Sequence, residues 1–255
     1  MKSRNYKNLK VSIILPNYNS SDYIKSTIKS IFDQTFKNWE LILVDDNSNQ
    51  KTKKILNLFK KNKKIKIYQL KKNKGAGYCR NLAIKKSKYK YLAYIDSDDV
   101  WKKNKLKKHL NFMYKNNYQF SYTNYKTFLN KEKKLNKVNV PDSFTFEKFT
   151  KNTSIATSTM IVKKKVLKGI RFTDSKICED YYFKCKILKK IGTAYLLNEY
   201  LTNYRIREGS LQSNKLRNFT WIWKINSKYN KFNIFKNFIS LFFISINSLI
   251  KYGFK

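Results

Sequence analysis

The chain has 255 residues, which is enough for one sizeable hydrophobic core or two small ones. Its hydrophobic content of 42% and aromatic content of 16% exclude an intrinsically disordered chain. The 56 Lys and Arg against 16 Asp and Glu give a net charge of +40, typical of proteins that meet nucleic acid, a membrane surface or a phosphorylated substrate. Lys, Asn, Ile, Tyr and Phe are all abundant and have A/T-rich codons, so a biased genome explains the charge equally well.

The cysteines and the single histidine argue against zinc-binding and disulfide-rich classes of protein. Cys79, Cys178 and Cys185 are odd in number and lack ligand-like spacing, and His109 is the only histidine. We therefore expect neither a Cys/His zinc site nor a disulfide framework. No signal peptide opens the chain, and no run of about 18 apolar residues occurs. We expect a cytoplasmic protein without a spanning helix.

The first half of the chain alternates between strand-like and helix-like segments. The apolar, β-branched run 11–15 predicts a strand buried on both faces, and residues 19–35 then carry isoleucines at helical spacing. Short connections imply right-handed crossovers and an α/β fold with a mostly parallel central sheet flanked by helices. The predicted strands are 11–15, 39–46, 64–70 and 90–95, and the predicted helices are 19–35, 50–62 and 77–88.

Polar and acidic residues follow each predicted strand. Ligands of parallel sheets lie beyond the carboxyl ends of the strands, so we expect these residues to converge on one edge. Each group alone is more typical of a helix cap, a turn or a solvated loop, and their coincidence is what indicates a site. They are Pro16, Asn17, Tyr18 and Asn19 after the first strand, Asp45 and Asp46 after the second, Asn73, Gly75 and Gly77 after the third, and Asp96, Asp98 and Asp99 after the fourth.

The acidic turn after the fourth strand suits a divalent cation. Asp96 and Asp98 have the D-x-D spacing at which two carboxylates can face one Mg²⁺ or Mn²⁺ that bridges to substrate phosphates. Such an ion offsets the repulsion between the acids and a diphosphate. Nearby, Asp46 can accept a hydrogen bond from a base or a ribose, and Tyr18 can stack on a base. Arg80, at the start of a helix, can bind phosphate.

In order and spacing these segments resemble the inverting family 2 glycosyltransferases, which have the GT-A nucleotide-diphospho-sugar transferase fold. The resemblance runs from about residue 11 to about 215. It implies a metal-dependent enzyme that moves a sugar from a nucleotide-diphosphate donor, a UDP-sugar, to a saccharide or lipid-linked saccharide in bacterial surface polysaccharide or glycolipid synthesis. The matching pieces are "VSIILPNYNSSDYIKSTIKSIFDQTFKNWELILVDDNS", "NKGAGYCRN", "YLAYIDSDD", "NTSIATSTMIVKKKVL" and "ICEDYYFKCKIL".

The resemblance implies roles for individual residues. Asp180 matches the catalytic base, which takes the proton of the acceptor hydroxyl during one in-line displacement, and Glu179 is the acid beside it. Asp96 and Asp98 match the pair that contacts metal, diphosphate and donor sugar, with Asp99 as a substitute ligand. Without the resemblance, Asp180 is better explained as an acid at a helix start. The remaining donor-binding candidates are Pro16, Tyr18, Asn19, Asp45, Asp46, Gly75, Arg80, Ser97, Arg205 and Arg207.

One stretch departs from the family pattern. Where the family often has Y-R-x-H-x-x-S, this chain reads "YRIREGS": Arg205 and Ser210 match, but Arg207 replaces the frequent histidine. A guanidinium cannot act as a neutral metal ligand. We expect Arg207 to replace metal coordination with a direct contact to the diphosphate.

Three other classes are weighed against a glycosyltransferase. "GAGYCR" with Asp96 some 20 residues on resembles a dinucleotide-binding fingerprint, but Arg80 replaces the third glycine and the motif follows the third strand. A sugar nucleotidyltransferase has a related fold, but "PNYNSSDY" stands where its Gly-rich loop would be. A basic nucleic-acid-binding protein would use the charge and the aromatics, yet leaves the acid cluster unexplained. We expect no nucleic-acid partner.

The chain is expected to divide at about residue 215. Residues 1–215 form the predicted GT-A domain, with a nucleotide-binding half at about 11–125 and an acceptor half at about 126–215, and residues 216–255 form a helical tail. In the tail, the aromatics and basic flanks of 234–255 suit a helix lying on an anionic membrane. A helix that closes the hydrophobic core is the equal alternative. For the first of these two alternatives, we expect peripheral contact with the cytoplasmic face of a membrane.

Overall fold

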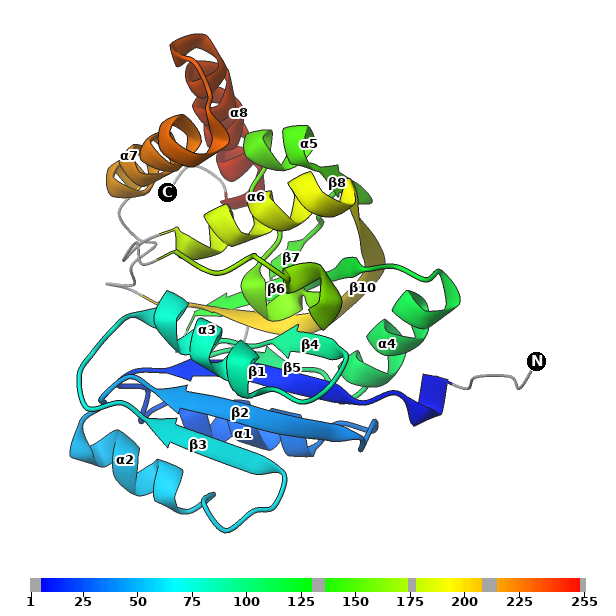
Figure 1. The fold of residues 1–255 in the computed structure, drawn as a ribbon, viewed down its shortest axis with the longest axis vertical. Coiled ribbons are helices and arrows are strands. Elements are labelled where there is room, and N and C mark those ends of the chain that lie inside the picture. Colours follow the sequence, from blue (N-terminus) through cyan, green and yellow to red (C-terminus); the bar gives the residue numbers. More distant parts are fainter. Residues whose placement is uncertain (1–5, 130–135, 174–177, 208–214, 253–255) are drawn as a thin grey trace.

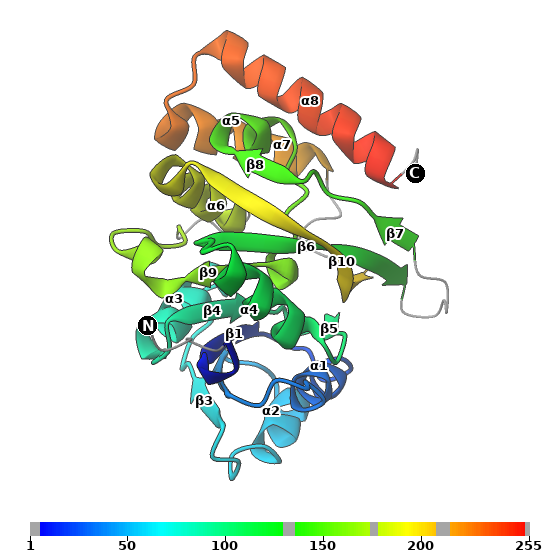
Figure 2. The ribbon, with the colours of Figure 1, turned by 90° about the vertical axis from the view of Figure 1, so that its right-hand side faces the viewer.

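One curved, mixed sheet runs through the molecule (Figures 1 and 2). The computed structural model describes residues 6–129, 136–173, 178–207 and 215–252. The strand order is β3-β2-β1-β4-β9-β6-β10-β5, and β7 pairs with β6 and β8 with β10. The strands are β1 Val11–Asn17, β2 Trp39–Asp45, β3 Ile65–Gln69, β4 Tyr91–Tyr94, β5 Val100–Trp101, β6 Phe120–Leu129, β7 Asn136–Val138, β8 Ser143–Thr145, β9 Ile161–Lys163 and β10 Thr193–Ile206.

The first four strands are parallel, as the alternation of the sequence predicts. β1 pairs with both β2 and β4, and β2 pairs with β3. Every residue of β1 and β2 is buried, which is why both read as continuous apolar runs. The carboxyl ends of all four strands therefore lie on the same edge of the sheet, and the predicted convergence of the loops is geometrically correct.

Helices cover both faces of the sheet. Ile24, Ile28 and Ile31 of α1 pack with Val11, Ile13 and Leu15 on one face, together with apolar residues of α4. Cys79 and Ala83 of α3 pack with apolar residues of α6 on the other face. This arrangement confirms the predicted α/β class. The helices are α1 Ile24–Phe32, α2 Gln50–Asn57, α3 Ala76–Lys86, α4 Lys105–Lys115, α5 Phe146–Lys151, α6 Glu179–Ile191, α7 Lys215–Ile225 and α8 Ile234–Tyr252.

The second half of the chain extends the same sheet. β9 lies antiparallel between β4 and β6 and so joins the two halves edge to edge, and β6 pairs in parallel with β10. Just before β9, a 3₁₀ turn at Thr157–Thr159 crosses the ends of the strands. Helix α6 begins beside this turn with Glu179 and Asp180 in its first turn, where the helix dipole favours acids.

The C-terminal segment consists of two helices joined by a short π-helix, Asn226–Asn230. Helix α8 packs on α5 and α7, beyond α6 and at the opposite end of the molecule from α2 and β3 (Figure 1). Ile222, Ile225 and Ile244 join the larger hydrophobic cluster, so one side of the tail does close the core. Within the described ranges, none of the helices combines the length and the apolar character that crossing a membrane requires.

Candidate active site

The loops after β1 and β2 are tied together by buried hydrogen bonds. Asp45 is fully buried, and its Oδ1 accepts hydrogen bonds from Asn17 Nδ2 at 2.7 Å and from Ser48 Oγ at 2.5 Å. Asn19 N donates to Ser48 Oγ at 2.9 Å, and the Asn19 side chain accepts from Asn49 N at 2.8 Å. Asp45 and Asn19 therefore fix the conformation of these two loops.

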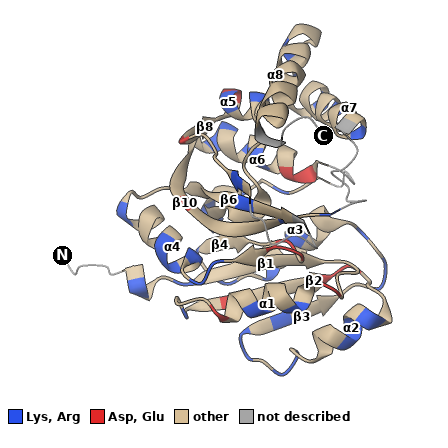
Figure 3. Ribbon diagram, turned by 180° about the vertical axis from the view of Figure 1, so that it is seen from behind, with Lys and Arg blue, Asp and Glu red and all other residues tan. Residues whose placement is uncertain are grey.

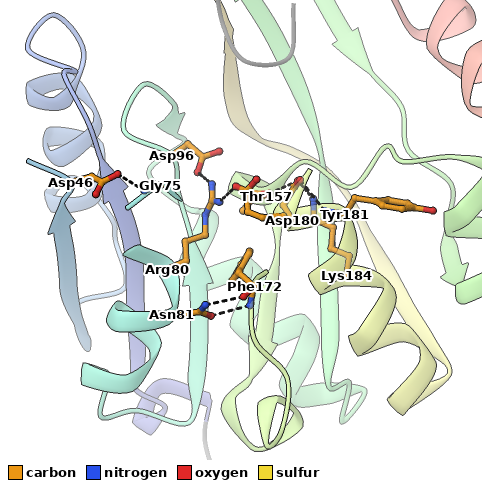
Figure 4. Close-up of polar contacts among 11 residues, drawn as sticks. Asp46, Gly75, Arg80, Asn81, Asp96, Thr157, Phe172, Asp180, Tyr181 and Lys184 are labelled. Atoms are coloured by element: carbon orange, nitrogen blue, oxygen red, sulfur yellow. Dashed lines mark hydrogen bonds and ion pairs between the residues drawn. The ribbon is translucent and has the colours of Figure 1, made fainter. Parts of the chain in front are cut away.

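Asp46 shapes the glycine-containing loop after β3. Its two carboxylate oxygens accept hydrogen bonds from the backbone N–H groups of Lys74 and Gly75, each at 2.7 Å. Figure 4 shows the contact with Gly75. Gly75 is the N-cap residue of α3 and has φ +87°, a conformation that favours glycine. The start of α3 is thereby fixed next to the end of β2.

Arg80 joins the two acidic motifs of the chain. Its guanidinium pairs with Asp96 Oδ1 at 2.7 Å and with Glu179 Oε1 at 2.6 Å, and it lies 5.3 Å from the centre of the Phe172 ring (Figure 4). Arg80 is 5% exposed; burial works to lower its pKa, but the charges of Asp96 and Glu179 outweigh burial and raise it. The residue predicted to bind phosphate is thus engaged by two carboxylates.

Close packing brings α3 against the segment that leads into α6. A Cβ on Gly77 would lie 2.6 Å from the carbonyl oxygen of Thr173 and 3.1 Å from Glu179 Cγ, so only glycine fits there. The Asn81 amide donates to the Phe172 carbonyl and accepts from the Phe172 N–H, both at 2.9 Å. These contacts hold Glu179 within reach of Arg80.

The acidic turn after β4 is held from several sides. Asp96 N donates to Ser158 Oγ at 2.9 Å, and Thr27 Oγ1 donates to the carbonyls of Ser97 and Asp99 at 3.0 and 2.9 Å. Asp99 is 1% exposed and accepts a hydrogen bond from Arg205 N at 2.9 Å. Burial, together with the nearby charges of Asp98 and Asp96, raises the pKa of Asp99 well above its usual range.

Arg207 contacts the second carboxylate of the D-x-D turn. Its Nε pairs with Asp98 Oδ2 at 2.6 Å, while Arg205 Nε donates to the Asp98 carbonyl at 2.9 Å. Both guanidinium groups lie over the Tyr23 ring, at 4.7 Å for Arg205 and 5.5 Å for Arg207. Burial raises the pKa of Asp98, and the charge of Arg207 works against this rise. The arginine that replaces the family histidine is therefore at the acidic turn itself.

Asp180 lies at the start of α6 with its carboxylate fixed. Asp180 Oδ2 pairs with Lys184 Nζ at 2.7 Å and accepts from Thr157 Oγ1 at 3.0 Å, and Oδ1 accepts from Tyr181 N at 2.9 Å (Figure 4). Burial works to raise the pKa of Asp180, but Lys184, Arg80 and Thr157 outweigh it and lower the pKa to about 2. Asp180 is therefore a carboxylate at neutral pH.

The donor set of the acidic turn fits a hard divalent cation. Asp96 Oδ1 is engaged by Arg80 and Asp98 Oδ2 by Arg207, which leaves each carboxylate one further oxygen. Across the described ranges, no three His, Cys, Asp or Glu side chains gather as a metal-binding group. Phosphate oxygens and water would complete the coordination, which is the usual way in which Mg²⁺ is held.

The acidic motifs lie along one edge of the sheet, at the ends of β2 and β4 and at the start of α6 (Figure 3). Arg80 contacts both Asp96 and Glu179, whereas Asp46 contacts the loop before α3 and Asp98 contacts Arg207, just after β10. Pro16 is buried within β1, Ser97 is half-buried, and Tyr18 is 51% exposed at the same edge. Ser210 lies outside the described residues.

Sequence reasoning missed several residues of the site. Lys184, which is 3% exposed at its side chain, also donates to the Ile155 carbonyl at 2.7 Å, and its position four residues after Asp180 on a helix was a usable signal. Ser158 and Thr157 reach the two acidic motifs from the 3₁₀ turn; they lie in a segment that matches the family, but neither was predicted as a site residue. Behind this turn, buried Lys105 donates to the Thr159 carbonyl at 3.1 Å, and burial lowers its pKa to about 7.

A mostly parallel sheet with a D-x-D turn at one strand end and an acidic pair at the start of α6 fits the GT-A class of sugar transferases. The sequence matches the family described as Glycosyl transferase family 2 over residues 12–171, more than half of the chain. The chain therefore belongs to this family and is a glycosyltransferase. Family membership favours this class over the oxidoreductase and nucleotidyltransferase interpretations.

Two of the relatives are glycosyltransferases of named bacteria. The chain is 36% identical over 234 residues to Bacillus subtilis TuaG, a glycosyltransferase named for teichuronic acid biosynthesis, covering 91% of this chain and 92% of TuaG. It is 34% identical over 217 residues to Escherichia coli WfgD, covering 84% of each; WfgD is named a UDP-Glc:alpha-D-GlcNAc-diphosphoundecaprenol beta-1,3-glucosyltransferase.

A solved structure confirms the fold. The S. aureus TarS fragment 1–349, crystallised with UDP-GlcNAc, superimposes with a TM-score of 0.72 at 24% sequence identity. The match covers 96% of this chain and 74% of that chain. The predicted GT-A fold class is thereby confirmed.

Proposed function

We propose that the chain transfers a sugar, with inversion, from a UDP-sugar to a hydroxyl of a lipid-linked saccharide at the cytoplasmic face of a membrane. The observation that carries this proposal is the Arg80 bridge, which brings Asp96 of the donor motif and Glu179 of the acceptor motif into one site. WfgD, with a UDP-Glc donor and a diphosphoundecaprenol-linked acceptor by name, supports the choice of substrates. Residues 11–125 would form the donor half, residues 126–215 the acceptor half and residues 216–255 the tail.

The donor would lie across the carboxyl ends of β1, β2 and β4. Tyr18 is the exposed aromatic ring at this edge and can stack on the base, while the loop that Asp46 fixes leads into the start of α3. Arg207 is 37% exposed at its side chain and can turn from Asp98 to the diphosphate. Asp96 and Asp98 would hold Mg²⁺ or Mn²⁺, which when bound neutralises charge on the leaving diphosphate.

Asp180 would act as the base. Its carboxylate takes the proton of the acceptor hydroxyl as the acceptor oxygen forms a bond to the anomeric carbon. The bond between that carbon and the β-phosphate oxygen breaks, its electron pair leaves with UDP, and the configuration inverts. Lys184 and Thr157 hold Asp180 Oδ2, which leaves Oδ1 as the oxygen that carries only a backbone hydrogen bond.

Donor hydrolysis and transfer test this proposal. Purified protein is given a panel of nucleotide sugars with Mn²⁺, with Mg²⁺ or with excess chelator, and release of the nucleoside diphosphate is measured. We expect UDP release from one UDP-sugar. With the chelator we expect at least a tenfold loss of rate, because without a cation the two carboxylates repel the diphosphate. Full activity in excess chelator would refute the metal assignment, and release from a different nucleotide sugar would refute the donor.

A further inference from the structure

Helix α8 presents a broad apolar face to solvent. Its side chains on this face are between 36% exposed, at Ile246, and 78% exposed, at Ile250. Spaced one, three and four residues apart, they cover about half of the helix circumference. We call them the outer face of α8; its residues are Ile234, Phe235, Phe238, Ile239, Phe242, Phe243, Ile246 and Ile250.

The opposite face of α8 is fixed to the protein. Asn237, Ser240 and Ile244 are buried, and Ser240 Oγ donates to the Thr150 carbonyl of α5 at 2.5 Å. Asn226 Nδ2 donates to Ser240 Oγ at 3.1 Å. Turning the outer face inward would break these buried hydrogen bonds, so the orientation of the helix is set. An exposed apolar surface of this size in a soluble domain marks an interaction site.

The charged residues of the C-terminal segment all have one sign. Residues 209–255 contain no Asp or Glu and eight Lys or Arg. Lys236 lies over the Phe232 ring at 4.6 Å, Lys224 over the Trp221 ring at 5.3 Å, and Lys151 of α5 over the Phe243 ring at 5.4 Å. Long basic side chains that rest on aromatic rings can place their ammonium groups among lipid headgroups while the rings contact acyl chains.

An apolar cavity borders the same surface. It has a volume of about 280 Å³ and lies between α7 and α8, lined by Phe219, Trp223 and Leu241 among others. The Trp223 ring meets the Phe238 ring edge to face, with centroids 5.1 Å apart. Indole and phenyl rings side by side are suited to the boundary between water and hydrocarbon.

These observations point to a lipid surface and not to a second copy of the chain. Two outer faces packed together would bring two sets of basic side chains against each other, with no acid in 209–255 to pair with them. An anionic bilayer offers the opposite charge and an apolar layer at once, and each Lys or Arg near such a surface adds to binding. We propose that the outer face of α8 docks on an anionic membrane, which would hold the start of α6 near a lipid-linked acceptor.

Vesicle binding tests the proposal, and it is measured without donor or acceptor so that it does not depend on the proposed function. The full chain is sedimented with phosphatidylcholine vesicles, with and without phosphatidylglycerol, at low and at high salt. We expect binding only with phosphatidylglycerol, and weaker binding at high salt. The double variant Phe235→Ser, Phe242→Ser should bind at least about tenfold more weakly, because two exposed rings no longer enter the bilayer.

Matched variants separate the surface from the charge of the whole protein. Lys224→Glu with Lys236→Glu should weaken binding about tenfold or more, whereas Lys54→Glu with Lys60→Glu, the same change in net charge on and just after α2, should have little effect. Equal binding by both charge variants, or by the Phe variant and wild type, would overturn the proposal. So would a stable dimer that the Phe variant disrupts without any vesicle binding by wild type. UDP release is also measured in solution, and a rate for the Phe variant equal to that of wild type would show that its active site is intact. Absence of UDP release from every form of the protein would count against the proposed function and not against membrane docking.

Discussion

Both acidic motifs of the site are paired with cationic side chains of the protein, but these side chains come from different parts of the chain. At the D-x-D turn, the cations come from distant segments: Arg80 from α3 and Arg207 from the end of β10. At Asp180, the cation is Lys184, one helical turn away on the same rigid helix. Under the proposed function, the turn would exchange its partners when a diphosphate and a metal bind, whereas the partner of Asp180 would stay in place.

This difference separates two functions of a charge pair. A guanidinium that moves from a carboxylate to a phosphate still has an anionic partner, and the carboxylate that it leaves can then bind a cation. A lysine that stays beside a base keeps it ionised and oriented, but also lowers its basicity. Substitutions at Asp180, Arg80 and Lys184 should therefore act on turnover, stability and pH dependence respectively.

The largest effect is expected for Asp180→Asn. The amide keeps the size of the side chain but cannot take a proton, so turnover should fall by about 10² to 10⁴-fold. Affinity for the nucleotide should change little, because the groups assigned to it are on other elements. UDP affinity by calorimetry and turnover by UDP release are the measurements.

The control for this variant is Asp33→Asn, the same change in an exposed acid that pairs with Lys29. Near-normal turnover of Asp180→Asn in a folded protein would mean that another group is the base. A loss of nucleotide affinity equal to the loss of turnover would assign Asp180 to donor binding.

Arg80→Met tests the bridge between the two halves. Asp96 and Glu179 would lose their shared cation and face each other as like charges, so we expect a loss of about 3 kcal/mol in the free energy of unfolding. Lys29→Met is the control, because it breaks an exposed pair in which the side chains are 74% and 51% exposed, and such pairs contribute about 0.5 kcal/mol or less. Urea denaturation measures both, and similar losses for the two variants would refute a structural role for the bridge.

The fold was largely predictable and the site only in part. Strands β1 to β4 and helices α1 to α3 follow from apolar runs and helical periodicity, because these elements are buried on defined faces. The convergence of Asp46 and Asp96 on one edge follows from the parallel topology. A helical tail was also predicted, but its exposed face could not be, because which side packs on α5 depends on hydrogen bonds such as that from Ser240 to Thr150.

What the sequence could not predict is the pairing between distant residues. Arg80 and Glu179 are 99 positions apart, and their contact depends on Gly77 allowing α3 to approach the segment before α6. Periodicity and spacing carry no information on such contacts. For the same reason the sequence does not reveal that Asp45 is fully buried in hydrogen bonds to Asn17 and Ser48, and the donor-binding roles of Arg80 and Asp45 stay predictions.

The smallest effect, and the sharpest test of the comparison, is expected for Lys184→Met. In the wild type, the lowered pKa of about 2 keeps Asp180 ionised throughout the working range of the enzyme. Without Lys184, the two largest effects that lower the pKa of Asp180 are lost, whereas burial, which raises it, remains against the weaker effects of Arg80 and Thr157, so this pKa should rise towards or above its usual value near 4. Because the base must be ionised, the acidic limb of the kcat/KM profile should move up by at least about one pH unit, while the rate at pH 8 changes only a few-fold.

The free energy of unfolding should depend on pH in the direction that the lowered pKa of Asp180 requires. A lowered pKa in the folded state stabilises the protein above the unfolded pKa of about 4, and this stabilisation is lost as the pH falls towards 2. The wild type should therefore lose stability over this range more steeply than Lys184→Met does. Lys186→Met, the same change two residues along α6, is the control and should leave both profiles unchanged. If the acidic limb does not move in Lys184→Met, Lys184 is a purely structural partner of Asp180. The two acidic motifs would then differ only in where their cations come from, not in what those cations do.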